Sequence, residues 1–143
     1  MDGIKIVLVE DNPADAELTI RSFRKGNIDN KIVHLKDGEE AINYFFSEPG
    51  KSDHNFKSTL IILDLRLPKV DGLEVLKRLK LTEETKNIPV VVLTSSRDDK
   101  DMIESYKLGV NSYVLKPLDF EKFITSARDL GIYWLLINKL PQA

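Results

Sequence analysis

Two kinds of segment alternate along the chain. Short runs in which nearly every residue is apolar are followed by longer segments in which apolar residues recur every three or four positions. The short runs predict buried strands, and the periodic segments predict amphipathic helices. The expected strands are 4–9, 31–35, 60–64, 90–94 and 112–115. The expected helices are 13–26, 38–46, a segment through 75–79, a segment through 102–109, and one from about 119 toward 138.

This alternation predicts an α/β fold built on a parallel sheet. Strands that are apolar throughout are buried on both faces, so helices must cover both sides of the sheet. Right-handed connections then give a five-stranded, doubly wound parallel sheet with five helices. The polar, turn-rich residues 47–59 are expected to form a loop at the end of the sheet where the strands begin. No linker interrupts the pattern, so residues 1–143 are expected to form one domain.

Composition narrows the class of protein. Of the 143 residues, 42% are hydrophobic and 31% are charged, which is ordinary for a globular domain. The formal net charge is −2 and no basic run is present, which argues against nucleic-acid binding. The absence of cysteine excludes disulfides, thiolate metal sites and cysteine nucleophiles. The apolar runs are too short to span a membrane and the N-terminus lacks a signal-peptide pattern, so we expect a soluble, cytoplasmic protein.

Polar side chains stand where the expected strands end. Glu10 and Asp11 follow the first strand, Asp64 ends the third, Thr94 ends the fourth, and Lys116 follows the fifth. Because ligands of such sheets bind beyond the carboxyl ends of the strands, these residues are candidates for one site. Three clustered carboxylates repel one another unless a cation lies among them. Without His or Cys ligands at this edge, the expected cation is a hard one, with Mg²⁺ as the first choice.

Each of these residues also has an ordinary structural explanation. An acidic residue after a strand often caps the next helix, and here Pro13 suits a first helical turn. The Thr94 hydroxyl could be satisfied within its strand, and a lysine is usually solvated at the surface. The two histidines, His34 and His54, lie in no metal-ligand motif and are expected to face solvent.

Considered together, the strand-end residues resemble a known family. The segments that carry the resemblance are Val9-Glu10-Asp11-Asn12, Leu63-Asp64-Leu65-Arg66-Leu67-Pro68 with Asp71-Gly72, Leu93-Thr94-Ser95-Ser96, and Tyr113-Val114-Leu115-Lys116-Pro117. In this order and spacing, the chain resembles the receiver domain of bacterial two-component response regulators, which has a flavodoxin-like fold. The resemblance extends over residues 4–117.

The resemblance implies a phosphoacceptor and a metal site. Asp64 would attack the phosphoryl group of a phosphohistidine on a sensor histidine kinase. A carboxylate is already the nucleophile at neutral pH, so no general base is needed. Mg²⁺ would be held by Asp11, Asp64 and the backbone carbonyl of Arg66, with Glu10 acting through a bound water.

The resemblance also implies groups that respond to the phosphoryl group. Lys116 and the Thr94 hydroxyl would bind phosphoryl oxygens, and a cis bond before Pro117 would aim the lysine. Thr94 and Tyr113 would form the switch, with Tyr113 turning inward on phosphorylation. For Tyr113, surface packing on the sheet is the alternative.

Two other functional classes compete with this assignment. One is a pseudo-receiver, an interaction module that is never phosphorylated, but such modules usually lose part of the set Asp11, Asp64, Thr94 and Lys116. The other is an enzyme on the same fold, a flavin carrier or an aspartate-nucleophile phosphatase. The phosphatase would need an acid where Arg66 stands, and no glycine-rich phosphate loop is present. We therefore expect a switch that at most catalyses its own phosphotransfer and dephosphorylation.

The end of the chain suggests a narrower resemblance and an interface. The loop 47–59, the segment 89–94 and the C-terminal segment 131–141 are similar to the small stand-alone regulators that accompany phytochrome-type histidine kinases. The last helix uses the remaining chain, so we expect no effector domain and an output by protein–protein contact. The apolar residues expected to face the sheet from this helix are Phe120, Phe123, Ile124, Ala127, Leu130, Trp134 and Ile137.

Three apolar residues lie off that stripe, namely Ile132, Tyr133 and Leu136, and Leu140 follows them. An exposed apolar group near a chain end usually marks an interface, so they predict a homodimer or a kinase-docking surface. Scattered apolar residues at a frayed terminus are the alternative.

Overall fold

A computed structural model describes residues 3–47, 56 and 58–139 of the chain, with the side chain of Leu136 left out. The first half contains β1 (Lys5–Val9), α1 (Pro13–Lys25), β2 (Ile32–Leu35), α2 (Gly38–Phe46) and β3 (Thr59–Leu63). The second half contains α3 (Gly72–Leu81), β4 (Val90–Thr94), α4 (Asp99–Lys107), β5 (Ser112–Leu115), α5 (Phe120–Ile132) and a π-helical turn, η1 (Tyr133–Ile137).

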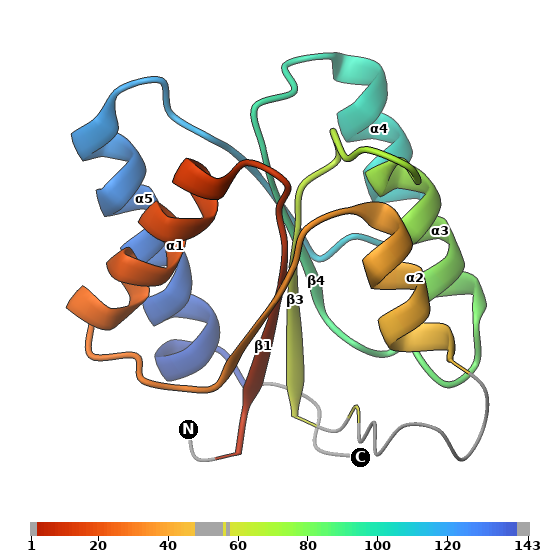
Figure 1. Cartoon of the computed structure of the whole chain (residues 1–143), viewed down its shortest axis with the longest axis horizontal. Coiled ribbons are helices and arrows are strands. Elements are labelled where there is room, and N and C mark those ends of the chain that lie inside the picture. The colour runs from red at the N-terminus through yellow and green to blue at the C-terminus, as the bar shows by residue number, and fades with distance from the viewer. Residues whose placement is uncertain (1–2, 48–55, 57, 140–143) are drawn as a thin grey trace.

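The five strands form one parallel sheet in the order β2-β1-β3-β4-β5. Figure 1 shows α1 and α5 on one face of this sheet and α2, α3 and α4 on the other. The predicted five-stranded, doubly wound α/β fold is therefore confirmed. Each of the five predicted strands is present to within about one residue at its ends, as expected for fully apolar runs between turn residues.

Alternate residues of each central strand serve the two halves of the core. Val7, Ile61 and Val92 face one way and pack with Phe45 of α2 and Leu76 of α3. The intervening residues face the other way. They pack with α1 and α5, and this second cluster includes Ile6, Leu8, Ile62, Leu93, Phe23 and Trp134. Period-two alternation within wholly apolar strands is what a sheet covered on both faces requires.

The helix capping follows the sequence signals closely. The Asn12 side chain accepts a hydrogen bond from the Asp15 backbone N–H, and Pro13 occupies the first turn of α1. Asp37 and Asp119 cap α2 and α5 in the same way. These caps satisfy backbone N–H groups that have no partner within the helix, and so they fix where each helix starts relative to the strand before it.

Two glycines let the loops above the sheet pack closely. A Cβ atom on Gly72 would lie 2.4 Å from the backbone carbonyl oxygen of Asp64, and one on Gly38 would lie 1.8 Å from that of Val70. Neither contact is possible for a larger residue without a backbone shift. The Gly72 contact holds the start of α3 against the residue that ends β3.

The C-terminal helix differs from its prediction in which side chains it buries. Phe123, Ala127, Leu130 and Trp134 are buried as expected, but Phe120 is 61% exposed and Ile137 is 67% exposed. Phe120 is the first residue of α5 and lines a shallow pocket with Leu18 of α1. The π-helical turn changes the angular spacing of the residues after 132, so that the adjacent residues Trp134 and Leu135 are both buried and Ile137 turns outward.

The prediction of a loop over residues 47–59 falls largely outside the described residues. Within the described part, β3 begins at Thr59, one residue earlier than predicted.

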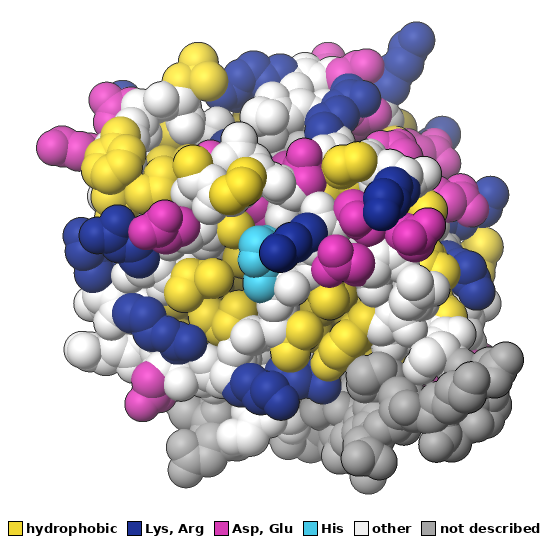
Figure 2. Space-filling model, in the orientation of Figure 1, with side chains coloured by type: hydrophobic (Ala, Val, Ile, Leu, Met, Phe, Trp, Pro, Cys, Tyr) yellow, Lys and Arg dark blue, Asp and Glu magenta, His cyan; other side chains and the backbone are white. Residues whose placement is uncertain are grey.

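Among the described helices, none combines the length and the apolar character that crossing a bilayer would require. Figure 2 shows acidic and basic side chains interspersed over the visible face, so that face carries no extended surface of one sign.

Candidate functional site

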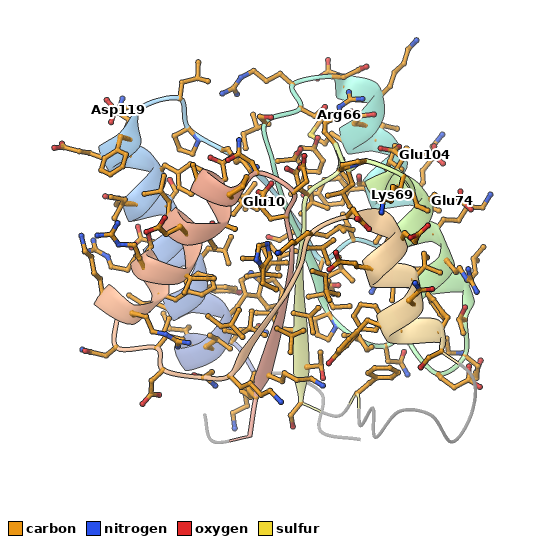
Figure 3. The ribbon with its side chains drawn as sticks, in the orientation of Figure 1. Glu10, Arg66, Lys69, Glu74, Glu104 and Asp119 are labelled. Atoms are coloured by element: carbon orange, nitrogen blue, oxygen red, sulfur yellow. The ribbon has the colours of Figure 1, made fainter. Side chains whose placement is uncertain are left out.

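The chain brings together the polar residues that follow its central strands. Glu10 follows β1, Asp64 follows β3, Thr94 ends β4 and Lys116 follows β5, and all four are buried. Because these parallel strands are neighbours, their carboxyl ends meet at one edge, the upper edge in Figure 1. Glu10 is labelled at this edge in Figure 3. Asp11 follows Glu10 and is exposed.

Lys116 is the centre of the charged network. Its Nζ atom lies 2.5 Å from Glu10 Oε1, 2.8 Å from Asp64 Oδ2 and 2.9 Å from Asp15 Oδ2. The Lys116 backbone N–H donates to the Thr94 carbonyl oxygen at 2.7 Å, which anchors the residue at the end of the sheet. The lysine is therefore not a solvated surface cation. The peptide bond between Lys116 and Pro117, which the family resemblance implied to be cis, is trans, and trans is the usual preference of X-Pro bonds.

The second oxygen of Asp64 accepts two hydrogen bonds. The Thr94 hydroxyl donates to Asp64 Oδ1 at 2.7 Å, and the Arg66 backbone N–H donates to the same atom at 3.2 Å. Among the acidic side chains of the described residues, Asp64 alone accepts from both Lys116 and Thr94. The Thr94 hydroxyl in turn accepts from the Ser96 backbone N–H at 3.2 Å, so its proton is directed toward Asp64.

These contacts shift the ionisation of the buried groups in opposite directions. Burial and the adjacent Asp64 carboxylate raise the pKa of Glu10 to about 8. Burial alone would also raise the pKa of Asp64, but the hydrogen bond and charge of Lys116, with the Thr94 hydroxyl, lower it below its usual value. Burial opposes the charged form of Lys116, but its bonds to Asp64 and Glu10 raise its pKa. Asp64 is thus kept ionised.

Three carboxylates fit a divalent cation. Glu10, Asp11 and Asp64 each have an oxygen atom within 4.8 Å of the others. Carboxylate oxygens are the ligands that hard cations prefer, and two of these groups are buried while Asp11 opens to solvent. The chemistry of the donor set therefore fits a divalent ion.

Further polar contacts link this site to α4. The Ser96 hydroxyl donates to Asp101 Oδ2 at 2.5 Å, and the Arg66 guanidinium donates to the same oxygen at 2.6 Å. Figure 3 shows Arg66 at the upper edge, beside α4. Tyr113 is half-buried, and its hydroxyl donates to the Ser96 carbonyl oxygen at 3.3 Å. Asp64, through Arg66 and Thr94, is thereby connected to the first turn of α4.

Sequence reasoning missed two residues of this network, Asp15 and Asp101. Both are acids in the first turn of a helix, where acidic residues are common because they interact favourably with the helix dipole. A structural role is thus the default for such positions. The one signal available for Asp15 is that it faces the same end of the sheet as the acidic pair before it. His34, expected to face solvent, is partly exposed, and its Nε2 atom also contacts the Glu10 carbonyl oxygen at 2.8 Å.

The predicted interface residues have different surroundings. Tyr133 is 49% exposed, as predicted. Ile132 is partly buried against the core cluster beneath α5, so its assignment to an exposed group is wrong. It lies at the end of α5, where the π-helical turn begins. The side chain of Leu136, and the residues Leu140 and His54, lie outside the described part of the chain.

Comparison with known sequences identifies a family and several relatives. The family described as "Response regulator receiver domain" matches residues 6–128. The chain is 42% identical over 140 residues to the probable methanogenesis regulatory protein FilR2 of Methanothrix harundinacea, covering 98% of this chain and 89% of that protein. It is 38% identical over 138 residues to the response regulator Rcp1 of Synechocystis, covering 96% and 93%.

Solved structures give the same relationship. The Mn²⁺-bound form of Rcp1 superposes with a TM-score of 0.88 at 36% identity, covering 96% of this chain and 99% of that one. The phosphorylated cyanobacterial phytochrome response regulator RcpA gives 0.87 at 36% identity, covering 96% and 98%. One of these similar structures thus carries a divalent metal ion and the other a phosphoryl group.

Proposed function

The chain belongs to the family of response regulator receiver domains, and we propose that it is a stand-alone phosphoacceptor switch in which Asp64 receives a phosphoryl group from a histidine kinase. The observation that carries the proposal is the environment of Asp64. This buried carboxylate accepts hydrogen bonds from Lys116 on one oxygen and from Thr94 on the other. The set that a pseudo-receiver usually loses, Asp11, Asp64, Thr94 and Lys116, is intact.

The proposed reaction forms one bond and breaks one. A carboxylate oxygen of Asp64 attacks phosphorus while the P–N bond to the kinase histidine breaks, and the leaving imidazole nitrogen keeps the electron pair. Asp64 needs no base, because Lys116 and Thr94 lower its pKa despite burial. The Lys116 ammonium and the Thr94 hydroxyl are placed to bind the phosphoryl oxygens, so catalysis is mainly positioning and charge stabilisation.

We propose Mg²⁺ as the cation of this site. Asp11, Asp64 and the backbone carbonyl of Arg66 would hold it, and Glu10 would act through a bound water. When bound, Mg²⁺ supplies positive charge that offsets the acidic cluster and the phosphoryl oxygens. The donor set of oxygen atoms and the Mn²⁺ in the similar structure of Rcp1 support a divalent metal.

The proposed partner is a sensor histidine kinase, and more narrowly a phytochrome-type one. Similarity to the phytochrome response regulator RcpA supports the narrower partner. The Methanothrix relative is named as a probable methanogenesis regulatory protein, and that name mentions no light sensor. Membership of the receiver-domain family supports a histidine kinase as the phosphoryl donor, whichever stimulus that kinase senses.

We also propose that the C-terminal region mediates homodimer formation. Two large apolar side chains of η1, Tyr133 and Ile137, are exposed, and exposed apolar groups favour association. Light scattering at tens of micromolar should give the mass of a dimer. Replacement of both residues by Glu should give a monomer that is still phosphorylated by acetyl phosphate. A monomeric wild type would contradict the dimer.

The test of the phosphoacceptor function uses acetyl phosphate as a kinase-free donor. Intact-protein mass spectrometry should show the addition of one phosphoryl group in the presence of Mg²⁺ and none in excess EDTA. Hydroxylamine should remove the group, because it cleaves acyl phosphates. A folded, Mg²⁺-loaded protein that gains no mass would contradict the proposal.

A further inference from the structure

The Lys116 ammonium has three acidic neighbours in this structure: it donates hydrogen bonds to Asp64 and Asp15 and forms an ion pair with Glu10. Glu10, Asp64 and Asp15 lie 2.5, 2.8 and 2.9 Å from the Nζ atom. An ammonium group has three donors and no more. The phosphoryl group would be carried by Asp64, so its oxygens can take the donor that now faces Asp64, and they gain a second donor only if Asp15 or Glu10 gives up its place.

The burial of Glu10 and Asp15 indicates which of these two neighbours yields. The side chains of Glu10 and Asp64 are 2% and 5% exposed, whereas that of Asp15 is 27% exposed. A carboxylate that gives up its contact with an ammonium must be solvated by water in place of that cation. A buried carboxylate cannot be solvated in this way, so the loss of its cation is strongly unfavourable. The Asp15 side chain, in the first turn of α1, is partly exposed, so water can solvate it without a change in the fold. The exchange is thus easiest at Asp15.

We propose that Asp15 is a positioning residue that occupies one donor of Lys116 before phosphorylation and yields it to the phosphoryl group. This inference rests on the proposed phosphoacceptor function and deepens it. Asp15 does not belong to the acidic triplet Glu10, Asp11 and Asp64, so its effect is exerted on the lysine and not on the metal.

The charge of Asp15 acts in the same direction as its hydrogen bond. The acidic side chains of Glu10, Asp11, Asp15 and Asp64 surround or adjoin the single ammonium of Lys116. An arriving phosphoryl group adds further negative charge near the same lysine. Asp15 therefore both competes for the donor and repels the group that must replace it. Its presence lowers the affinity of the site for phosphoryl groups.

The experiment compares Asp15→Asn with Glu17→Gln. Glu17 lies two residues further along α1, is exposed and pairs with Arg21, so this control removes the same charge from the same helix away from the site. The probe is beryllofluoride, a phosphoryl mimic, titrated by calorimetry in saturating Mg²⁺. Asp15→Asn should bind it about three- to tenfold more tightly, the range expected for one partly exposed charge, and Glu17→Gln should match the wild type.

Two further readouts separate positioning from a general effect on the fold. Asp15→Glu keeps the carboxylate and should return the affinity toward that of the wild type. In the wild-type protein, the side-chain carboxyl ¹³C resonance of Asp15 should move when beryllofluoride binds, and that of Glu17 should not. This resonance tests the exchange even if a substitution at position 15 disturbs folding.

Unchanged or weaker binding by a folded Asp15→Asn variant would overturn the inference, as would an Asp15 carboxyl resonance that does not respond to the probe. In both cases a wild type that binds the probe leaves the proposed function standing. A wild type that binds no beryllofluoride in saturating Mg²⁺ would instead contradict the proposed function itself.

Discussion

Thr94 shows how one hydroxyl connects the fold to the proposed chemistry. It ends β4, is fully buried, donates to Asp64 and accepts from the Ser96 backbone N–H. A valine would have nearly the same shape and would fit the strand equally well. The hydroxyl is therefore explained by its partners and not by strand propensity.

Replacing Thr94 by Val should slow phosphorylation by acetyl phosphate by roughly a hundred- to a thousandfold. The estimate is the usual loss when one donor to developing charge is removed from an enzyme site. Thr94→Ser keeps the hydroxyl and should stay within a few-fold of the wild type. The rate is measured by intact mass at fixed Mg²⁺. Equal rates for the Val and Ser variants would show that the hydroxyl has no role in transfer.

Much of the site's composition could be predicted from the sequence, because it depends on strand ends. In a parallel sheet, the residues after neighbouring strands must meet at one edge, so placing Glu10, Asp64 and Lys116 on strand ends places them together. Asp15 and Asp101 could not be predicted in this way. They lie on helices, where their orientation depends on packing that a one-dimensional pattern does not contain.

At the scale of elements, hydrogen bonds to the Asp101 carboxylate connect α4 to the site. Asp101 Oδ2 accepts from both Arg66 and Ser96, which belong to the loops after β3 and β4. The Arg66 side chain is largely exposed, so this ion pair is screened by solvent. The Ser96 bond is buried and carries more of the connection.

Asp101→Asn should loosen α4 without unfolding the domain. Backbone amides of 99–107 should exchange with deuterium about three- to tenfold faster, the range expected for losing one charge-assisted contact that is partly exposed. Asp99→Asn changes an exposed acid in the same turn and should leave exchange unaltered. The same exchange rates in both variants would mean that Asp101 does not hold α4.

The start of α2 gives a prediction for pH. The Glu40 backbone N–H and the nearby Lys69 lower the pKa of Asp37 below its ordinary value. A carboxyl group whose pKa is lower in the folded state stabilises the fold above its unfolded pKa, and this contribution is lost as pH falls through the folded value. Asp37→Asn keeps a capping side chain but cannot titrate.

Urea unfolding should therefore show that the difference in stability between wild type and Asp37→Asn is larger near neutral pH and shrinks as the pH falls and Asp37 becomes protonated in the folded state. The wild type should be the more stable of the two near neutral pH. A difference that is constant across this range would contradict the role assigned to the Asp37 charge.

The elements themselves were predictable except where a helix changes type. Strand positions follow from apolar runs, and helix starts follow from Asn12, Asp37 and Asp119 as caps. The burial of the C-terminal segment did not follow, because the prediction assumed α-helical spacing throughout. One π-helical turn moves Ile137 outward and brings Leu135 into the core.

For the whole molecule, the acidic cluster links metal binding to stability. Three acidic groups lie close together in the folded state, and the unfolded chain relieves the repulsion between them that helps to raise the pKa of Glu10. A ligand that binds only the folded state stabilises it, by about 1.4 kcal/mol when its concentration is ten times the dissociation constant. Mg²⁺ should therefore raise the thermal unfolding temperature.

Asp11→Asn should make the metal-free protein more stable and reduce the stabilisation by Mg²⁺. Without metal it should unfold at a higher temperature than the wild type, because one repelling charge is gone, and Mg²⁺ should raise that temperature much less. Thermal unfolding in EDTA and in excess Mg²⁺ measures both effects. A variant that gains as much from Mg²⁺ as the wild type would exclude Asp11 from the metal site.

The most direct measurement of the central claim is the position of the phosphoryl group. Borohydride reduces an aspartyl phosphate to homoserine, and peptide mass spectrometry then locates the modified residue. After treatment with acetyl phosphate and Mg²⁺, we predict homoserine at position 64 alone, and none in a folded Asp64→Asn variant. Homoserine at another aspartate, or undiminished phosphorylation of Asp64→Asn, would contradict the assignment of Asp64 as the phosphoacceptor.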